Sequence, residues 1–285
     1  MKMKEIVITP YGGLANRMRA LNAAIEYAKA EGARLQAVWF CNSELNAPYD
    51  ALFTPPGEVN CAENEIVTIR SGSFFDRFLY RSPRRHTLWL PYLIAPLLFD
   101  TRIYSQEFKR LREQGLLESV IKKGKRVLIE SCYEFGDYYA ALSRNFVPVP
   151  DILDAVNEYV EKHFTGHTVG IHIRRTDNWL SIEKSPLSLF IDAMHREIAA
   201  CDDTNFYVAT DDEATKEELK NIFGERVLTQ KTDCSRDSIS GMKDAVKEMW
   251  LLSRTSRIYG CFYSSYSVIA SKLTNIPLQI LQIED

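Results

Sequence analysis

The sequence lacks the patterns that mark secreted, metal-binding or membrane-spanning proteins. Its six cysteines are scattered, with no C-x-x-C pair and no histidine at metal-ligand spacing, so neither a zinc site nor a disulfide framework is predicted. No N-x-S/T sequon occurs, and residues 1–13 lack a signal-peptide core. The longest apolar run, residues 88–99, contains two prolines and is shorter than the about 20 residues that span a bilayer. We expect a cytoplasmic protein with, at most, peripheral membrane contact.

The chain also lacks the basic excess of a general nucleic-acid-binding protein. Its formal net charge is −3, so any basic site must be local and no nucleic-acid partner is predicted. Hydrophobic residues make up 46% and charged residues 26% of the sequence, as in ordinary globular proteins. With 285 residues, the chain is long enough for two domains that each bury a core.

What is present is an alternation of short apolar strands and amphipathic helices. A strand, a helix and a second strand are expected over residues 5–9, 14–32 and 34–40, and another strand over 126–130. After the Pro-rich residues 147–150, helices are expected over 151–163, 186–200, 213–223, 238–254 and 267–273, with strands over 168–174, 205–209, around 227, and over 257–261 and 277–283. Residues 62–114 fit no pattern. The sequence predicts two α/β domains, residues 1–150 and 151–285, facing across a cleft.

A glycine turn joins the first strand to the first helix. Gly12 and Gly13 precede Asn16 and Arg17, at the point where free helix N–H groups attract anions. The pattern is neither G-x-G-x-x-G nor a P-loop, so an ordinary tight turn remains the alternative.

Two adjacent arginines follow the first strand of domain 2. Arg174 and Arg175 stand at a strand end, where α/β proteins bind ligands, and a guanidinium suits phosphate. His172 shares the strand face of Arg174, whereas Arg175 points to the other face unless the strand has ended. The motif therefore predicts a phosphate clamp dominated by Arg174, with salt bridges to carboxylates such as Asp177 as the alternative.

Two further motifs lie at strand ends or helix starts. In Ala209-Thr210-Asp211-Asp212, Asp212 suits a helix N-cap and Asp211 a ligand. Residues 263–267 form a hydroxyl-rich loop that includes Ser264 and Ser265, for which helix capping is again the alternative.

Taken together, four segments resemble the GDP-fucose-dependent fucosyltransferase superfamily, which includes α1,2-, α1,6- and protein O-fucosyltransferases. They are GGLANRMRAL near the N-terminus, HIRRTD at residue 172, ATDD at residue 209, and AVKEMWLLSRTSRIYGCFYSSYSVIAS over residues 245–271. The resemblance implies a GT-B fold with two Rossmann-like domains and the nucleotide held mainly by the second. It also implies inverting transfer of L-fucose from GDP-fucose to a glycan hydroxyl, with no metal or other cofactor.

The resemblance also implies roles for individual residues. Arg174 would bind the β-phosphate and stabilise departing GDP, with Arg175 assisting. The remaining donor-site residues are expected to be His172 and Asp211 on the nucleotide, Ser264 and Ser265 on ribose or phosphate, and Asn16 on the diphosphate, with Gly12, Gly13, Arg17 and Asp177 alongside.

The base and the acceptor are less well marked in the sequence. Glu183 is the nearest carboxylate after Asp177 and is the candidate general base, with a solvated pair to Lys184 as the alternative. Domain 1 would bind the acceptor, a glycan or lipid-linked saccharide, in a bacterial cytoplasmic enzyme. Two other functions stay open: the same fold using another nucleotide-diphosphate sugar, and a nucleotide-binding protein without catalysis.

Overall fold

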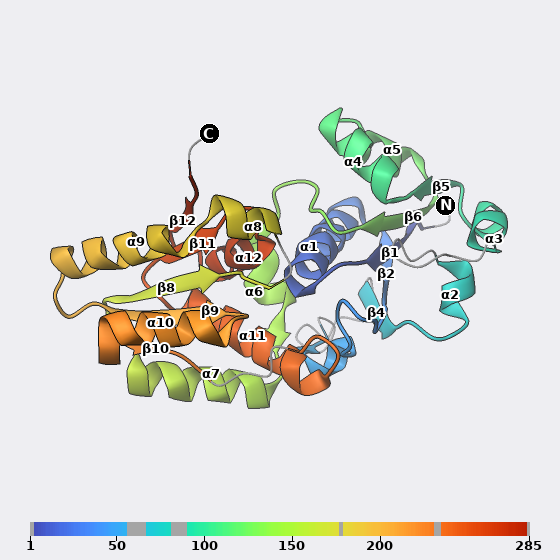
Figure 1. The fold of residues 1–285 in the computed structure, drawn as a ribbon. Helices are drawn as coiled ribbons and strands as arrows, with labels where there is room; N and C mark the ends of the chain where they lie inside the picture. Colours follow the sequence, from blue (N-terminus) through green and yellow to red (C-terminus); the bar gives the residue numbers. More distant parts are fainter. Residues whose placement is uncertain (1–2, 56–66, 81–89, 177–178, 231–234, 284–285) are drawn as a thin grey trace. The chain divides into compact units, whose positions relative to one another are not determined.

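The computed structural model describes residues 3–55, 67–80, 90–176, 179–230 and 235–283 (Figure 1). Their contacts divide the chain into two compact units: residues 1–149 with Ser235–Met242, and residues 150–234 with Lys243–Asp285. The short segment Ser235–Met242 therefore belongs with the first unit, although the sequence placed it in domain 2. Each unit is built around a five-stranded parallel sheet.

The first unit has the strand order β4-β2-β1-β6-β5. Its central strand β1 pairs with β2 and β6 in parallel, so that Ile8 lies opposite both Ala37 and Ile129. These central strands are buried almost completely, as expected for a parallel sheet covered by helices on both faces. The strands are β1 (Glu5–Pro10), β2 (Arg34–Trp39), β4 (Val67–Ser71), β5 (Thr101–Ile103) and β6 (Arg126–Ser131).

Helix α1 begins directly after the glycine turn and ends where Gly32 adopts a left-handed conformation. The stretch that fitted no sequence pattern contains β4, β5 and three short helices, and the prolines and exposed apolar residues of α3 obscure any period there. A two-stranded antiparallel pair, β3 (Phe53–Thr54) and β7 (Val147–Pro148), completes the described sheets of this unit. Its helices are α1 (Leu14–Glu31), α2 (Asp76–Leu79), α3 (Leu90–Leu98), α4 (Ser105–Glu113), α5 (Leu117–Lys123) and α6 (Leu142–Asn145).

The second unit has the strand order β10-β9-β8-β11-β12, which is the 3-2-1-4-5 arrangement of a Rossmann sheet. Its topological switch point lies between β8 and β11, where His172 is opposite both Ala209 and Gly260. The strands are β8 (Thr168–Ile173), β9 (Asn205–Thr210), β10 (Val227–Leu228), β11 (Ile258–Cys261) and β12 (Leu278–Leu281). The predicted α/β class is confirmed in both units.

The helices of the second unit follow the sequence pattern closely, with two differences. Helix α8 was not predicted, because its six residues are too few to show a period. Helix α12 begins at Ser265, two residues earlier than expected. The helices are α7 (Pro150–His163), α8 (Trp179–Lys184), α9 (Leu187–Ala200), α10 (Glu213–Phe223), α11 (Ile239–Ser253) and α12 (Ser265–Thr274).

The two faces of β8 have different neighbours. Ile171 and Ile173 pack into a core with Phe190 and Met194 of α9. The alternate residues face α11 and α12, because a Cβ built on Gly170 would meet Leu252 and His172 stacks on Tyr266. His172 thus extends from the face opposite the apolar core, at the carboxyl end of the strand. Among the described helices, none combines the length and apolar character that crossing a membrane requires.

Candidate functional site

The carboxyl ends of β8 and β11 meet at the switch point of the second unit, and the predicted HIRRTD motif and the serine loop leave the sheet there. Cys261 connects the two segments. Its Sγ accepts from the backbone N–H of Arg174 at 3.2 Å and lies 3.4 Å from the carbonyl oxygen of His172. In open α/β sheets this crevice is where ligands bind, so the sequence pattern and the topology indicate the same place.

His172 is neutral and only partly hydrogen-bonded at this edge. The residue is 7% exposed, its ring stacks on Tyr266 with centroids 4.9 Å apart, and its Nδ1 is buried without a protein partner. Burial, together with the positive charge of Arg174 and against the opposing effect of Asp211, lowers the pKa of the imidazole to about 4. A neutral imidazole with an unpartnered nitrogen can donate to or accept from a ligand.

The two arginines have different surroundings. Strand β8 ends at Ile173, so both lie beyond the strand and are half-buried. Arg175 is engaged at one end of its guanidinium, where Nη1 donates to the carbonyl of Ser185 at 3.0 Å, whereas its Nη2 is buried without a protein partner. The charge of Arg174 acts on His172. The structure therefore places Arg174 next to the imidazole and directs Arg175 toward the segment after α8.

Asp211 ties down the loop that carries the arginines. Its Oδ1 accepts from the backbone N–H of Arg175 at 2.7 Å, and its Oδ2 accepts from the Thr176 hydroxyl at 2.6 Å. Both oxygens of the carboxylate predicted to contact the nucleotide thus bind the loop. The next residue, Asp212, caps α10 through a bond from the Thr215 amide, which confirms the predicted N-cap. Asp177 lies outside the described residues.

The serine loop places a buried hydroxyl at the start of α12. Ser264 is the N-cap residue and is 6% exposed, yet its Oγ makes no capping bond and has no protein partner. Ser265 is the first helical residue and is half-buried. Tyr263 adopts φ 56°, a left-handed conformation that a non-glycine residue adopts only at a cost. A helix start, a free hydroxyl and a strained turn are together suited to an anion.

Glu248 belongs to this region and was not singled out from the sequence. It lies on α11 one helical turn beyond Ala245, whose carbonyl accepts from the Tyr266 hydroxyl. Its Oε1 is buried without a partner, and desolvation raises the pKa of the carboxyl to about 7. Nearby, the Tyr207 hydroxyl is also buried and unpartnered. The available signal was weak: Glu248 follows Lys247 and precedes the apolar residues 249–252, and a buried glutamate usually requires a partner.

The candidate base Glu183 is the least favourably placed of the predicted residues. Ser181 on α8 and Ser185 just after it are buried and donate to the carbonyls of Phe262 and Leu281, so that face of the helix rests on the sheet edge. Glu183 lies between them in sequence and is exposed. A six-residue helix that anchors 181 and 185 turns 183 away from β11.

In the first unit, the glycine turn lies at the carboxyl end of β1. Gly12 has φ 86° and is buried, and its amide donates to Glu44 Oε2 at 3.0 Å. A Cβ on Gly12 would lie 3.0 Å from Asn16 Nδ2, so the turn packs closely on that side chain. Gly13 has no atom near its Cβ position and forms the N-cap of α1 without a side-chain bond. The backbone at Gly13 is thus open to close approach.

Arg17 serves the fold of this turn. It is fully buried, and its guanidinium donates to the carbonyls of Gly12 and Phe40 and to Asn42 Oδ1, at 2.8, 2.5 and 2.9 Å. The same group lies over the ring of Trp39. Burial lowers the pKa of Arg17 to about 10. Its Nε, Nη1 and Nη2 atoms all bind protein acceptors, so Arg17 holds the glycine turn in shape.

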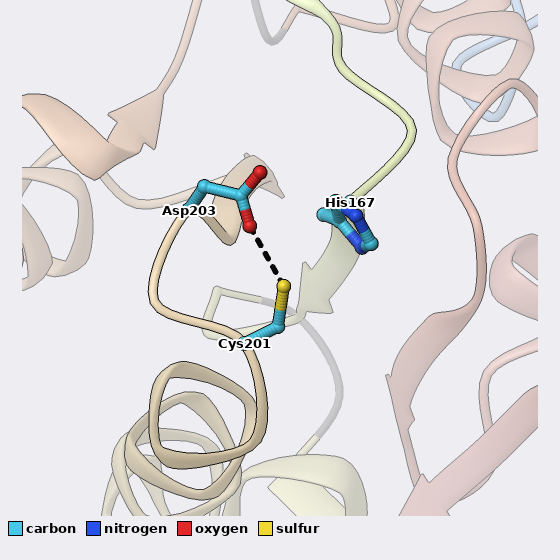
Figure 2. A group of neighbouring side chains, drawn as sticks. All are labelled: His167, Cys201 and Asp203. Carbon is cyan, nitrogen blue, oxygen red and sulfur yellow. Dashed lines mark hydrogen bonds between the residues drawn. The ribbon is translucent and has the colours of Figure 1, made fainter.

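One group of metal-ligand types occurs among the described residues, and it lies at the opposite edge of the second sheet. Figure 2 shows His167, Cys201 and Asp203, whose ligand atoms all lie within 4.8 Å of one another. Cys201 Sγ donates to Asp203 Oδ1 at 2.7 Å. His167 precedes β8 and the other two precede β9, so the group is at the amino ends of the strands, away from the switch point. The group has three residues, whereas a structural zinc site has four protein ligands.

The fold and this arrangement define a class. Two Rossmann-like units, with ligand-type groups at the carboxyl ends of parallel strands, are the plan of GT-B glycosyltransferases, so the predicted GT-B fold class is confirmed. No family model matches the sequence, and no curated protein sequence does.

Particular solved structures share the fold over nearly their whole length. A NodZ α-1,6-fucosyltransferase structure soaked with GDP-fucose aligns with a TM-score of 0.66 at 20% identity, covering 95% of this chain and 93% of that one. NodZ from Bradyrhizobium aligns with a TM-score of 0.63 at 19% identity over 95% and 92% of the two chains. POFUT1 in complex with GDP-fucose aligns with a TM-score of 0.62 at 10% identity over 98% and 99%. At these identities the likeness concerns the fold.

Proposed function

We propose that this protein is an inverting glycosyltransferase that moves L-fucose from GDP-fucose to a hydroxyl of a glycan or lipid-linked saccharide, without a metal cofactor. The observation that carries the proposal is a pair of unpartnered polar atoms at the carboxyl ends of β8 and β11, His172 Nδ1 and Ser264 Oγ, together with the unpartnered Oε1 of Glu248 on α11. Buried polar atoms are nearly always hydrogen-bonded, so these unsatisfied atoms favour a polar ligand. The GDP-fucose soak of a protein with the same fold supports the choice of ligand.

In this proposal the second unit neutralises the departing diphosphate with fixed protein groups. Arg174 would bind the β-phosphate, and the N-terminus of α12 with Ser264 and Ser265 would donate to phosphate or ribose oxygens. These groups are already positioned by the sheet, so they stabilise the charge that grows as GDP leaves without first having to reorganise. Arg175 and Asp211 would act by shaping the loop that presents Arg174.

The polar groups deeper on the same face would read the base. The Watson–Crick edge of guanine carries two adjacent N–H donors, which match the two oxygens of an ionised carboxylate. Glu248 supplies a buried, unpartnered carboxylate oxygen on the helix that also contacts Tyr266, the stacking partner of His172. Adenine presents a ring acceptor at the corresponding position and would be disfavoured. Glu248 would therefore favour a guanine nucleotide.

Proton removal from the acceptor is the least defined step. Glu183 stays the predicted base, and its exposed position on α8 makes it a group for direct test. The glycine turn of the first unit, with Gly12, Gly13 and Asn16, likewise stays a predicted ligand-binding element. A cytoplasmic location is the setting in which a sugar nucleotide would be available.

The decisive experiment is calorimetric titration with GDP, GDP-fucose, GDP-mannose and UDP-galactose, each with and without EDTA. We expect GDP and GDP-fucose to bind with unchanged affinity in EDTA and UDP-galactose not to bind. Binding of UDP-galactose would indicate that the donor is another nucleotide-diphosphate sugar. Binding of GDP-fucose with no hydrolysis or transfer across an acceptor panel would leave a nucleotide-binding protein without catalysis.

A further inference from the structure

An exposed apolar surface covers two short helices of the first unit. Among the large hydrophobic side chains exposed in the described part of the chain, five lie on or beside α2 and α3, which contact each other (Figure 1). Their exposed fractions range from 48% to 83%, and the residues are Phe74, Phe75, Tyr92, Leu93 and Leu97. We call these five residues the α2–α3 surface. Contiguous apolar surfaces of this kind mark interaction sites, unlike single exposed leucines.

Helix α3 shows why this surface exists. Pro91 and Ala95 are buried, and Phe99 just after the helix continues the same stripe into the core cluster. That stripe has an i, i+4 spacing and covers only one narrow face. The rest of Leu90–Leu98 is also apolar and contains no charged residue. The helix is therefore hydrophobic on all sides, but only one of its faces is buried against the protein.

The sequence segment that carries the surface is basic. Residues 67–104 contain six arginines and two aspartates, a net charge of +4 in a chain whose total is −3. Both aspartates are engaged: Asp76 binds Arg70 through both oxygens at 2.5 and 2.7 Å, and Asp100 accepts from backbone amides of residues 125 and 126. Arg77 on α2 is exposed. Three more arginines stand between α2 and α3 in the sequence.

We propose that the α2–α3 surface binds an anionic lipid bilayer, and, resting on the proposed transferase function, that the acceptor is a saccharide carried by a lipid in that bilayer. Apolar side chains that insert below the headgroups, together with flanking arginines, are what an anionic membrane surface attracts. Helix α3 has nine residues, about 13 Å of helix, and a bilayer core is about 30 Å thick, so the helix lies in the interface.

A second copy of the chain fits this surface less well. A two-fold contact would bring the same patch of both copies together, and with it the same positive charge. Like charges across an interface disfavour association, whereas the headgroups of anionic lipids supply the opposite charge.

The test is co-sedimentation of the full chain with vesicles, without sugar nucleotide. We expect binding to vesicles that mix phosphatidylglycerol with phosphatidylcholine, weaker binding to phosphatidylcholine alone, and a decrease at high salt. The double variant Leu93→Asp/Leu97→Asp should lose at least tenfold in affinity, and Arg77→Gln about fivefold. The matched control is Ile222→Asp, which changes a single exposed hydrophobic residue on α10, outside the α2–α3 surface, and should bind normally.

Two results would overturn the proposal. One is failure of the folded wild-type chain to bind anionic vesicles. The other is a concentration-dependent dimer in analytical ultracentrifugation that Leu93→Asp/Leu97→Asp abolishes, which would assign the surface to self-association. Because the vesicle assay contains no donor, its failure leaves fucosyl transfer untouched. For the acceptor, the double variant should lower transfer to a vesicle-borne saccharide and leave transfer to the same soluble saccharide unchanged; equal loss on both would contradict the lipid assignment.

Discussion

Each of the two sheets carries an arginine shortly after the end of its first strand, and the two arginines have opposite surroundings. Arg17 of the first unit is fully buried, and its donors bind Gly12, Phe40 and Asn42. Arg174 of the second unit is half-buried next to a neutral histidine with an unpartnered nitrogen. An arginine of the first helix thus holds a turn in one unit, whereas an arginine directly after the first strand lies beside a polar site in the other.

The neighbouring backbone explains the difference. In the first unit, the segment after β2 bends back so that the Phe40 carbonyl and Asn42 offer acceptors to the guanidinium. In the second, the equivalent work of fixing the loop is done by Asp211 and by the Arg175–Ser185 bond. These contacts fix the loop that carries Arg174 at the carboxyl end of β8.

The largest effect on stability is expected from Arg17→Met. The substitution removes the guanidinium donors of the Gly12 and Phe40 carbonyls and one of the donors of Asn42 Oδ1, so we expect a loss of about 3 to 5 kcal/mol in the free energy of unfolding. Urea denaturation would measure it, with the exposed Arg34→Met as control. A variant as stable as wild type would show that Arg17 is available for ligand binding after all.

Arg174→Ala should reduce activity and leave stability unchanged. Turnover should fall by about 10²- to 10³-fold, because the clamp stabilises charge that develops as GDP departs, while the denaturation midpoint should stay close to that of wild type. Steady-state transfer from GDP-fucose would measure the loss, and Arg196→Ala, an exposed arginine on α9, is the matched control. Near-normal turnover by folded Arg174→Ala would refute the proposed mechanism.

Glu248→Gln tests a carboxyl group that has a buried oxygen without a partner. The carboxyl has a pKa of about 7 in the folded chain, above its ordinary value near 4.5. Its contribution to the free energy of unfolding is therefore fully present below pH 4.5 and is lost as pH rises through 7. His172 acts oppositely: its folded pKa of about 4 lies below 6.5, so its contribution is present above 6.5 and lost as pH falls toward 4.

Between pH 4.5 and 6.5, the effects of Glu248 and His172 on the pH dependence of stability oppose each other. Removing the titration of Glu248 should therefore make the stability of the variant, relative to wild type, rise with pH by up to about 1 kcal/mol per pH unit. Denaturation at a series of pH values would show it. A difference that is constant between pH 4.5 and 7 would mean that the carboxyl is ionised throughout. Because the ionised carboxylate would accept from guanine, the GDP affinity of the wild type should rise as pH increases through 7, and Glu248→Gln should lack this rise.

The smallest effects are expected from a pair of serines. Ser264→Ala removes a hydroxyl that has no protein partner, so GDP should bind about tenfold more weakly while stability is unchanged. Ser185→Ala removes a hydroxyl that donates to Leu281 and accepts from the Phe262 amide, so it should lower stability by about 1 to 2 kcal/mol. Calorimetry and thermal denaturation of both variants would sharpen the contrast; weakened stability in Ser264→Ala would assign Ser264 to the fold.

Most strands and helices could be predicted from the sequence, because a parallel sheet requires apolar runs and its covering helices show a 3.6-residue period. Residues 168–173 and 205–210 are examples, and the Asp212 cap was evident from its position before a helix. The region from β4 to α4 could not be assigned, since α3 is apolar on every side and β5 has only three residues. Periodicity carries no information in either case.

The sequence alone determined the α/β class, the place where each motif leaves a strand and the presence of two neighbouring arginines, since these depend on order along the chain. Only the tertiary structure decided which side chains are already satisfied. Arg17 and Asp211 bind the protein itself, whereas His172, Ser264 and Glu248 each retain a buried polar atom without a partner. The physical reason is that hydrogen-bond partners here come from segments tens of residues apart, and only folding brings their acceptors and donors within reach.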